Sequence, residues 1–121
     1  MAHDPKDPRT WPNATIVIRG GTRNVGHLAN VMTRDGSWSV VSEPGVPFEV
    51  LAASIRNGTV RRTSVRRVLA VGGRLVPTRS DDAPPFHCDL FGLTPTAFDA
   101  ILGPEEPNPV AAYNRWRGTN R

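Results

Sequence analysis

Three observations predict a small α+β domain with a mixed or antiparallel sheet of about five strands and two to three short helices. The chain has 121 residues, which suits one domain. Its apolar residues fall in short runs, which suit short strands and helices around a modest core. The period of these runs changes between two and about 3.6 without strict strand–helix alternation, and this favours α+β over a doubly wound parallel sheet.

The first part of the chain predicts a polar lead-in, a strand and a helical segment. In residues 1–13 the prolines block helix formation, and Trp11 is the expected anchor to the body. The β-branched run 15–19 ends at two glycines and predicts a strand followed by a tight turn. Leu28 and its apolar neighbours recur at helical spacing, which predicts one or two helical turns over 25–32.

The middle of the chain predicts two strands and a helix. Alternating residues over 37–42 predict the second strand. Pro47 suits the first position of a helix, and apolar residues at helical spacing continue that helix to Ile55. Asn57-Gly58 predicts its left-handed C-cap, and residues 59–63 predict the third strand.

A capped helix and an edge strand are predicted next. Thr63 or Ser64 can cap a short helix that ends at Gly72-Gly73. Residues 74–78 predict a fourth strand, and it belongs at an edge because Pro77 cannot donate to a ladder.

A fifth strand over 86–91 and a last helix complete the predicted domain. Alternation divides the strand into one side with Phe86, Cys88 and Leu90 and another with His87 and Asp89. Thr94-Pro95 gives the cap and first position of the last helix, and Gly103-Pro104 stops it. We therefore expect one domain over 14–103, followed by a Pro/Arg-rich tail over 104–121.

Composition narrows the functional classes. The formal net charge is +4, and Lys6 is the single lysine among the 15 basic residues. Arginine forks bind phosphate and carboxylate bidentately, so a polyanion is an expected partner, although a GC-rich genome also produces an arginine bias. One cysteine, Cys88, excludes an intramolecular disulfide and a cysteine zinc cluster, and its place beside apolar neighbours predicts a core residue.

No apolar run approaches the length of a membrane span, and the N-terminus lacks the apolar core of a signal peptide. We expect a cytoplasmic protein, or one that a larger carrier delivers into a target cell.

Six arginines lie between Arg56 and Arg74. They predict a surface that binds the phosphate backbone of a nucleic acid. Because arginine binds phosphate directly, we expect no metal site. The alternative is a solvated helix face whose arginine stems cover apolar surface. The expected phosphate-binding residues are Arg61, Arg66, Arg67 and Arg74.

His87 and Asp89 form a candidate catalytic pair. Their spacing on a strand places both on one face, where the acid can orient the imidazole. Cleavage of RNA without metal needs a general acid or base beside the 2′-hydroxyl, and cations or hydroxyls that hold the phosphate. Arg62 and Ser64 are the expected partners in this role, and the alternative is a partly exposed histidine beside a carboxylate.

The pattern VIRGG, followed by SWSVVS, supplies a second candidate site. It resembles the strand-end Arg-Gly and the serine-containing strand of ADP-ribosyltransferase toxins. This resemblance implies that Arg19 and Gly20 hold the phosphates and ribose of NAD, and that Ser39 or Ser42 lies by the nicotinamide ribose. The family's catalytic glutamate motif has no evident counterpart late in this chain.

The size, basic charge and residue types are also similar in style to metal-independent ribonuclease toxins of the barnase and RelE type. The sequence therefore predicts a toxin-like effector domain that acts on RNA, without a cofactor. The first alternative is an NAD-dependent ADP-ribosyltransferase-like toxin. The second is a non-enzymatic basic module that binds nucleic acid or an acidic partner, such as an antitoxin or immunity protein.

Overall fold

The computed structural model describes residues 4–21, 25–55, 57–78 and 85–110 and confirms the α+β class. The strands are β1 (Ile16–Gly20), β2 (Trp38–Val41), β3 (Thr59–Ser64), β4 (Arg74–Pro77), β5 (His87–Phe91) and β6 (Glu106–Pro107). The helices are the 3-10 helix η1 (Pro8–Thr10), α1 (Val25–Asp35), α2 (Phe48–Ala52), α3 (Val65–Ala70) and α4 (Pro95–Ile101).

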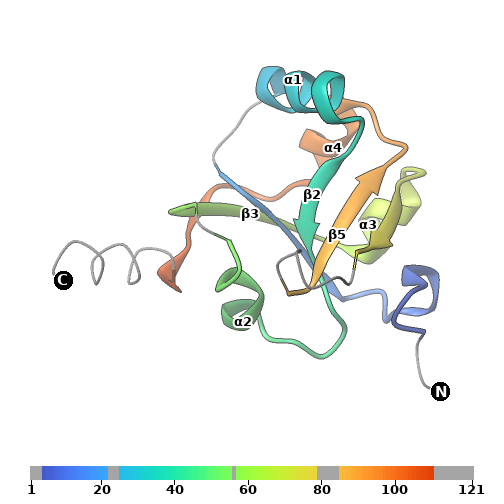
Figure 1. Ribbon diagram of the computed structural model, residues 1–121, viewed down its shortest axis with the longest axis vertical. Coiled ribbons are helices and arrows are strands. Elements are labelled where there is room, and N and C mark those ends of the chain that lie inside the picture. Colours follow the sequence, from blue (N-terminus) through green and yellow to red (C-terminus); the bar gives the residue numbers. More distant parts are fainter. Residues whose placement is uncertain (1–3, 22–24, 56, 79–84, 111–121) are drawn as a thin grey trace, which may run out of the picture.

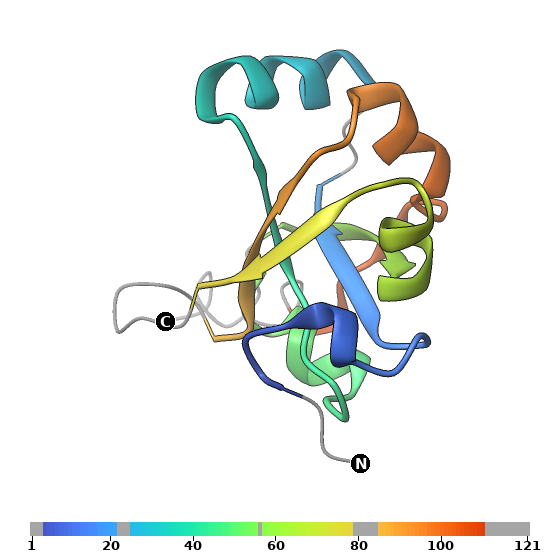
Figure 2. The same ribbon diagram turned by 90° about the vertical axis from the view of Figure 1, so that its right-hand side faces the viewer.

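All six described strands join one antiparallel sheet in the order β4-β5-β2-β1-β3-β6 (Figures 1 and 2). The larger apolar core lies between the sheet and the helices α1, α3 and α4. Trp38 is fully buried there, packs 4.7 Å from the ring of Phe98, and donates its indole N–H to the carbonyl of Leu28. The smaller core lies under α2, on Ile18, Val41 and Val60.

Local signals explain why two of the helices begin where they do. The hydroxyl of Ser64 accepts a hydrogen bond from the amide of Arg67, and the hydroxyl of Thr94 accepts one from Ala97. Each bond satisfies an amide that the first turn leaves without an intrahelical acceptor. The predicted caps are confirmed, with Ser64 rather than Thr63 serving α3.

The join between β1 and β2 is narrow. Their registered contact is the pair Ile18 and Val41, beyond which the two strands diverge toward α1 (Figure 1). Two side chains cross this join: the hydroxyl of Ser42 donates to the carbonyl of Ile16, and Arg19 donates to the carbonyl of Ser39. The sheet therefore consists of two halves, β4-β5-β2 and β1-β3-β6, which meet along this seam.

Three expectations for local structure were wrong. The helix after Pro47 ends at Ala52, so Asn57-Gly58 leads into β3 instead of capping that helix. Pro8 does not block helix formation, because proline is tolerated at the start of the short helix η1. Phe86 has a φ of 66° and packs in the smaller core, on the opposite side from Cys88 and Leu90.

Both ends of the chain contribute to the packed structure. Trp11 is 4% exposed, which confirms it as an anchor. At the other end Glu106–Pro107 pairs with β3, and the side chain of Asn108 is fully buried. The packed region thus includes part of the expected tail, whose residues 111–121 lie outside the described residues. No helix in the described ranges is long and apolar enough to cross a membrane.

Candidate functional site

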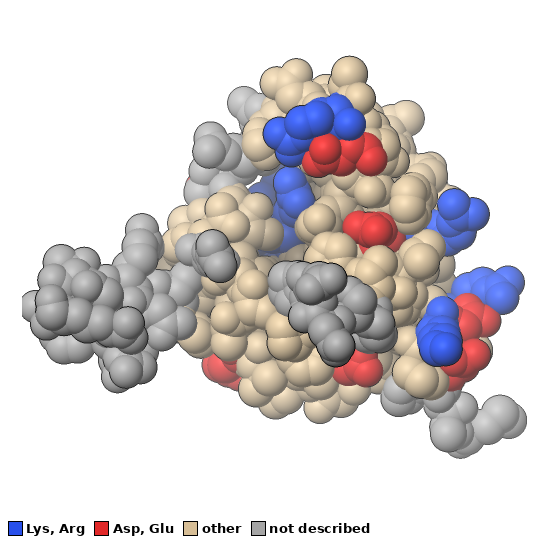
Figure 3. Space-filling view, viewed as in Figure 1, with Lys and Arg blue, Asp and Glu red and all other residues tan. Residues whose placement is uncertain are grey.

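A pocket of about 490 Å³ opens where β1 and β2 diverge. Small-molecule sites commonly have volumes of about 300–1,000 Å³. The lining residues come from β1, β2, β5, α1 and the connection between α2 and β3. They are Ile18, Arg19, Gly20, His27, Ser39, Val40, Val41, Ser54, Ile55, Asn57 and His87. Figure 3 shows this face hollowed beneath α1, with basic atoms inside the hollow.

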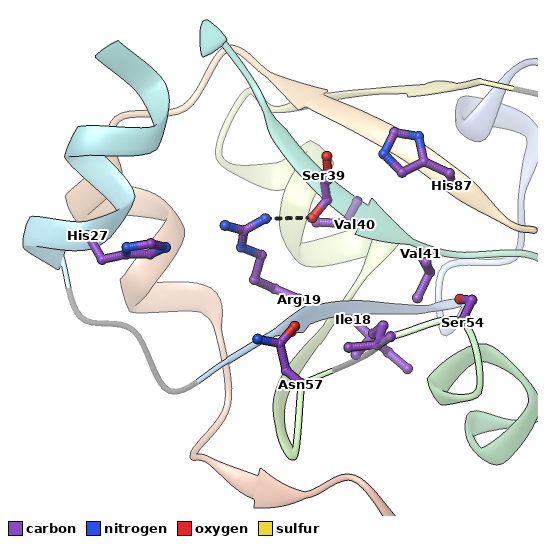
Figure 4. A pocket seen from close by; sticks show the side chains of 11 residues that line it. Ile18, Arg19, His27, Ser39, Val40, Val41, Ser54, Asn57 and His87 are labelled. Atoms are coloured by element: carbon purple, nitrogen blue, oxygen red, sulfur yellow. Dashed lines mark hydrogen bonds between the residues drawn. The ribbon is translucent and has the colours of Figure 1, made fainter. Parts of the chain in front are cut away.

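Arg19 is the only Lys or Arg among these lining residues. Its Nη1 donates to the carbonyl oxygen of Ser39 at 2.9 Å, which Figure 4 marks with a dashed line. Within the described part of the chain it makes no other hydrogen bond and no ion pair. A guanidinium carries five N–H donors, so the described residues leave most of those of Arg19 for a ligand.

Burial lowers the pKa of the Arg19 guanidinium, and the negative charge of Asp35 partly offsets this effect. The guanidinium still stays protonated at any physiological pH. A partly desolvated cation without an acidic hydrogen-bond partner gains from an anionic ligand. This electrostatic environment favours a ligand that carries phosphate or carboxylate.

Gly20 brings two chain segments unusually close together. A Cβ atom at this position would lie 2.5 Å from Oδ1 of Asn57 and 2.6 Å from Cγ2 of Ile55. A side chain at this position would therefore displace the side chains of Asn57 and Ile55 from β1. The glycine of the Arg-Gly pattern therefore shapes one wall of the pocket.

His87 reaches the pocket from β5. Its Nδ1 is hydrogen-bonded to the hydroxyl of Thr78, and its Nε2 lies 3.9 Å from Oδ1 of Asp89. The bond to Thr78 orients the ring, and the carboxylate of Asp89 is near enough to stabilise a positive charge on it. This geometry gives His87 the contacts expected of a general acid or base.

His27 projects from α1 toward Arg19 on the other side of the pocket (Figure 4). The pocket thus has an arginine and two histidines on its walls. The described lining residues include no Asp or Glu.

Arg61 lies outside the pocket and is bound by the protein itself. Its Nη1 pairs with Oδ1 of Asp99 at 2.6 Å, and its Nε donates to the carbonyl of Gly103 at 2.7 Å. Its Nη2 makes further bonds to the carbonyls of Asp99 and Leu102. Arg61 therefore satisfies carbonyls at the end of α4, an arrangement that leaves its fork little capacity for phosphate.

Arg62 also lies outside the pocket. It makes a bidentate pair with Glu106, with both bonds at 2.8 Å, and its guanidinium lies 4.3 Å from the centre of the Phe48 ring. Ser64, the other expected partner of His87, is the cap of α3. The structure does not bring either residue to His87.

The remaining expected phosphate ligands are on the surface. Arg66 and Arg67 are exposed on α3, and Arg74 lies over the ring of Phe91 at 5.3 Å. They do not join the pocket, and a role for them in binding nucleic acid stays a prediction.

The residues expected for NAD separate into two groups. Arg19, Gly20 and Ser39 line the pocket together. Ser42 is fully buried, and its hydroxyl donates to the carbonyl of Ile16 at 2.7 Å. Ser39 is therefore the serine of this strand that a ligand in the pocket can reach.

His27, Ser54 and Asn57 are pocket residues that the sequence did not indicate. They approach Arg19 only through long-range packing, and the Asn-Gly pair reads locally as a turn.

No cluster of three His, Cys, Asp or Glu with metal-binding geometry occurs in the described ranges. No protein-family model, curated protein or solved structure matches this chain.

Proposed function

We propose that this protein binds NAD in the Arg19 pocket and transfers its ADP-ribose unit, as an ADP-ribosyltransferase-like enzyme. The convergence of Arg19, Gly20 and Ser39 with His87 in one pocket carries the proposal. The residues expected for RNA cleavage are instead dispersed: Arg62 is held by Glu106, and Ser64 caps α3.

Binding of NAD first requires a positive charge that holds its pyrophosphate, and Arg19 supplies this charge. The N–H donors that the described residues leave unused lie in a partly desolvated pocket, where a charge-assisted hydrogen bond contributes about 1.5–3 kcal/mol. The ligand also compensates the cost of burying the guanidinium. Gly20 leaves room for the side chains of Asn57 and Ile55, which line the pocket beside it.

The chemistry needs a leaving group and a base. The bond between C1′ of the ribose and the nicotinamide nitrogen breaks, and its electron pair neutralises the pyridinium ring. The oxygen of an acceptor hydroxyl or of water bonds to C1′ and loses a proton. In this proposal His87 takes that proton, with Asp89 stabilising the resulting imidazolium at a separation of 3.9 Å.

The test is incubation of the protein with NAD, followed by measurement of released nicotinamide and of labelled ADP-ribose on protein or nucleic acid. Arg19→Ala should reduce nicotinamide release about a hundredfold, a loss of about 2.7 kcal/mol in transition-state stabilisation. Arg66→Ala is the matched control, because this exposed arginine lies outside the pocket. Intact NAD with folded wild-type protein would contradict the proposal.

A second candidate is metal-independent cleavage of RNA in the same pocket. The observation that favours it is that His87, which is near Asp89, lines the same pocket as the cationic Arg19. Total RNA incubated with the protein and a chelator should then be cleaved, and His87→Ala should abolish cleavage. If RNA and NAD both stay intact while RNA binding weakens steeply with salt, a non-enzymatic binding module is favoured.

A further inference from the structure

The connection between α2 and β3 places the side-chain amide of Asn57 at the pocket, without a hydrogen-bond partner among the described residues. The side-chain amide of Asn57 lines the pocket and is solvent-exposed. It makes no hydrogen bond to any residue that the structure describes. A carboxamide presents a donor and an acceptor side by side, so this group is available for both kinds of bond with a ligand.

The backbone of Asn57 is held in place by a buried amide. Asn108 is fully buried, and its Nδ2 lies 3.1 Å from the carbonyl oxygens of Ala52, Ile55 and Asn57. The backbone amide of Asn108 also donates to the carbonyl of Gly58 at 2.9 Å. These bonds fix the segment on both sides of Asn57.

Contact with Gly20 restricts the side chain of Asn57, while Asn108 holds its backbone. The side chain of Asn57 packs directly over the Cα of Gly20, in the space that a Cβ would need. Gly20 follows Arg19 in β1, so Asn57 lies over the strand residue next to Arg19, and the side chains of Asn57 and Arg19 both line the pocket (Figure 4). A preorganised polar group binds a ligand with less entropic cost than a mobile one.

We infer that Asn57 is a specificity-determining residue that recognises a planar ligand edge with adjacent hydrogen-bond donor and acceptor. Asn108 is its positioning residue. The inference rests on the proposed binding of NAD, which carries two such edges: the carboxamide of nicotinamide and the amino-pyrimidine edge of adenine. Bidentate pairing of an asparagine with adenine is a recurrent form of recognition.

The experiment measures binding of two probes, nicotinamide and adenosine monophosphate, by NMR titration of the full chain. Asn57→Ala should weaken one probe about tenfold, and the affected probe identifies which edge is recognised. Asn13→Ala is the control, because Asn13 is an exposed asparagine outside the pocket. Equal affinities of wild type and Asn57→Ala for both probes would overturn the inference.

The role of Asn108 has its own readout. Asn108→Ser should weaken the affected probe while leaving inorganic pyrophosphate, which reports on Arg19, within about twofold. The variant with both Asn57→Ala and Asn108→Ser should bind the probe no more weakly than Asn57→Ala alone. Equal weakening of pyrophosphate would show general damage to the fold and overturn the positioning role.

NAD turnover separates this inference from the proposed function. If wild type binds the probes but leaves NAD intact, the transferase proposal fails, and Asn57→Ala still decides the recognition of the edge. If wild type consumes NAD and Asn57→Ala binds both probes normally, the inference fails alone. If wild type binds neither probe nor NAD, both are overturned.

Discussion

Arg19 and Arg61 are directly opposite each other on β1 and β3, yet the protein treats them differently. Arg61 is 15% exposed in its side chain, pairs with Asp99, and donates to carbonyls at the end of α4. Arg19 donates one hydrogen bond, to the carbonyl of Ser39, and has no acidic partner among the described residues. One guanidinium supports the fold, while the other remains available for a ligand.

This difference shows what an arginine count leaves out. The stretch from 56 to 74 is rich in arginine, but Arg61 and Arg62 are bound by Asp99 and Glu106. Arg19 lies outside that stretch and has the greater unused capacity. The acceptors that the fold supplies, rather than the density of charge along the chain, determine which cation can bind an anion.

The largest expected effect on stability comes from Arg61→Ala. It removes the ion pair and leaves Asp99 and several carbonyls without their donor, so the free energy of unfolding should fall by about 3 kcal/mol. Urea unfolding measures this change. Arg61→Lys should recover only part of the loss, since an ammonium cannot reproduce the fork. A midpoint equal to that of wild type would remove the contrast with Arg19.

Arg19→Met should show the opposite pattern, with a large loss of activity and little change in stability. NAD consumption should fall about a hundredfold, or about 2.7 kcal/mol, while the free energy of unfolding changes by less than about 0.5 kcal/mol. Removing a partly buried cation that makes no ion pair with the described residues recovers its desolvation cost. Enzyme assays test the predicted loss of activity, and urea titrations test the predicted stability. A stability loss similar to that of Arg61→Ala would contradict the assignment of Arg19 as a ligand-binding residue.

This burial cost of Arg19 should not produce a pH dependence of stability in the working range. The folded-state pKa is lowered, so the cost is present wherever both states are protonated and is relieved only as the pH rises toward the unfolded pKa. The pKa of an arginine in an unfolded chain lies far above the physiological range. The difference in unfolding free energy between wild type and Arg19→Met should therefore stay constant from about pH 5 to pH 9.

Gly20→Ala should reduce stability by about 2 kcal/mol, because the new methyl group overlaps Asn57 and Ile55. Its effect should extend to the pocket wall and weaken NAD binding. Thermal unfolding and NAD titration measure the two effects. Gly36→Ala provides a comparison in open space, although its φ of 75° adds conformational strain. Normal NAD binding by Gly20→Ala would show that this wall does not contact the ligand.

Ser64→Ala tests whether this serine of the arginine-rich region has a structural role or a catalytic one. Loss of the cap should cost about 1 kcal/mol, and NAD consumption by the folded protein should stay at the wild-type rate. Ser64→Asp is the control, since aspartate also accepts a bond from the helix amides. A specific loss of activity in Ser64→Ala, without a change in stability, would restore the serine as a catalytic candidate.

The smallest effects are expected at Arg66 and Arg67. Both are exposed on α3, so alanine at either position should change the free energy of unfolding by no more than about 0.5 kcal/mol. Salt-dependent RNA binding supplies the more informative measurement. A reduced salt slope in these variants would support a polyanion surface on α3.

Local signals in the sequence predicted much of the fold. Ser64 and Thr94 are caps because their hydroxyls meet amides three residues along, an arrangement that sequence spacing reveals. The edge position of β4 follows from Pro77. The two-residue strand β6 and the positive φ of Phe86 depend on tertiary contacts, so no periodic pattern predicts them.

The candidate site was predictable only in part. The Arg19-Gly20 and Ser39 motifs lie on adjacent strands, and the structure brings them together. The expected meeting of His87 and Arg62 depended on a sheet order that spacing cannot give. In that order β2 and β1 separate β5 from β3, which corresponds to about 14 Å between the two strands. Asn57 joined the site through the buried Asn108, which lies in the part of the chain expected to be a tail.

The narrow seam between β1 and β2 has a mechanical consequence. The opposing walls of the pocket belong to the two halves of the sheet, whose backbone pairing is limited to Ile18–Val41 and is supplemented by the side-chain bonds of Ser42 and Arg19. The two apolar cores also span this seam. Each of these side-chain bonds contributes about 1 kcal/mol, so a change in the spacing of the halves at this point costs far less than breaking a full ladder. A ligand that takes Arg19 away from the carbonyl of Ser39 releases one of these connections as it binds. Under the proposed function, the guanidinium would thereby link occupancy of the pocket to the distance between its walls.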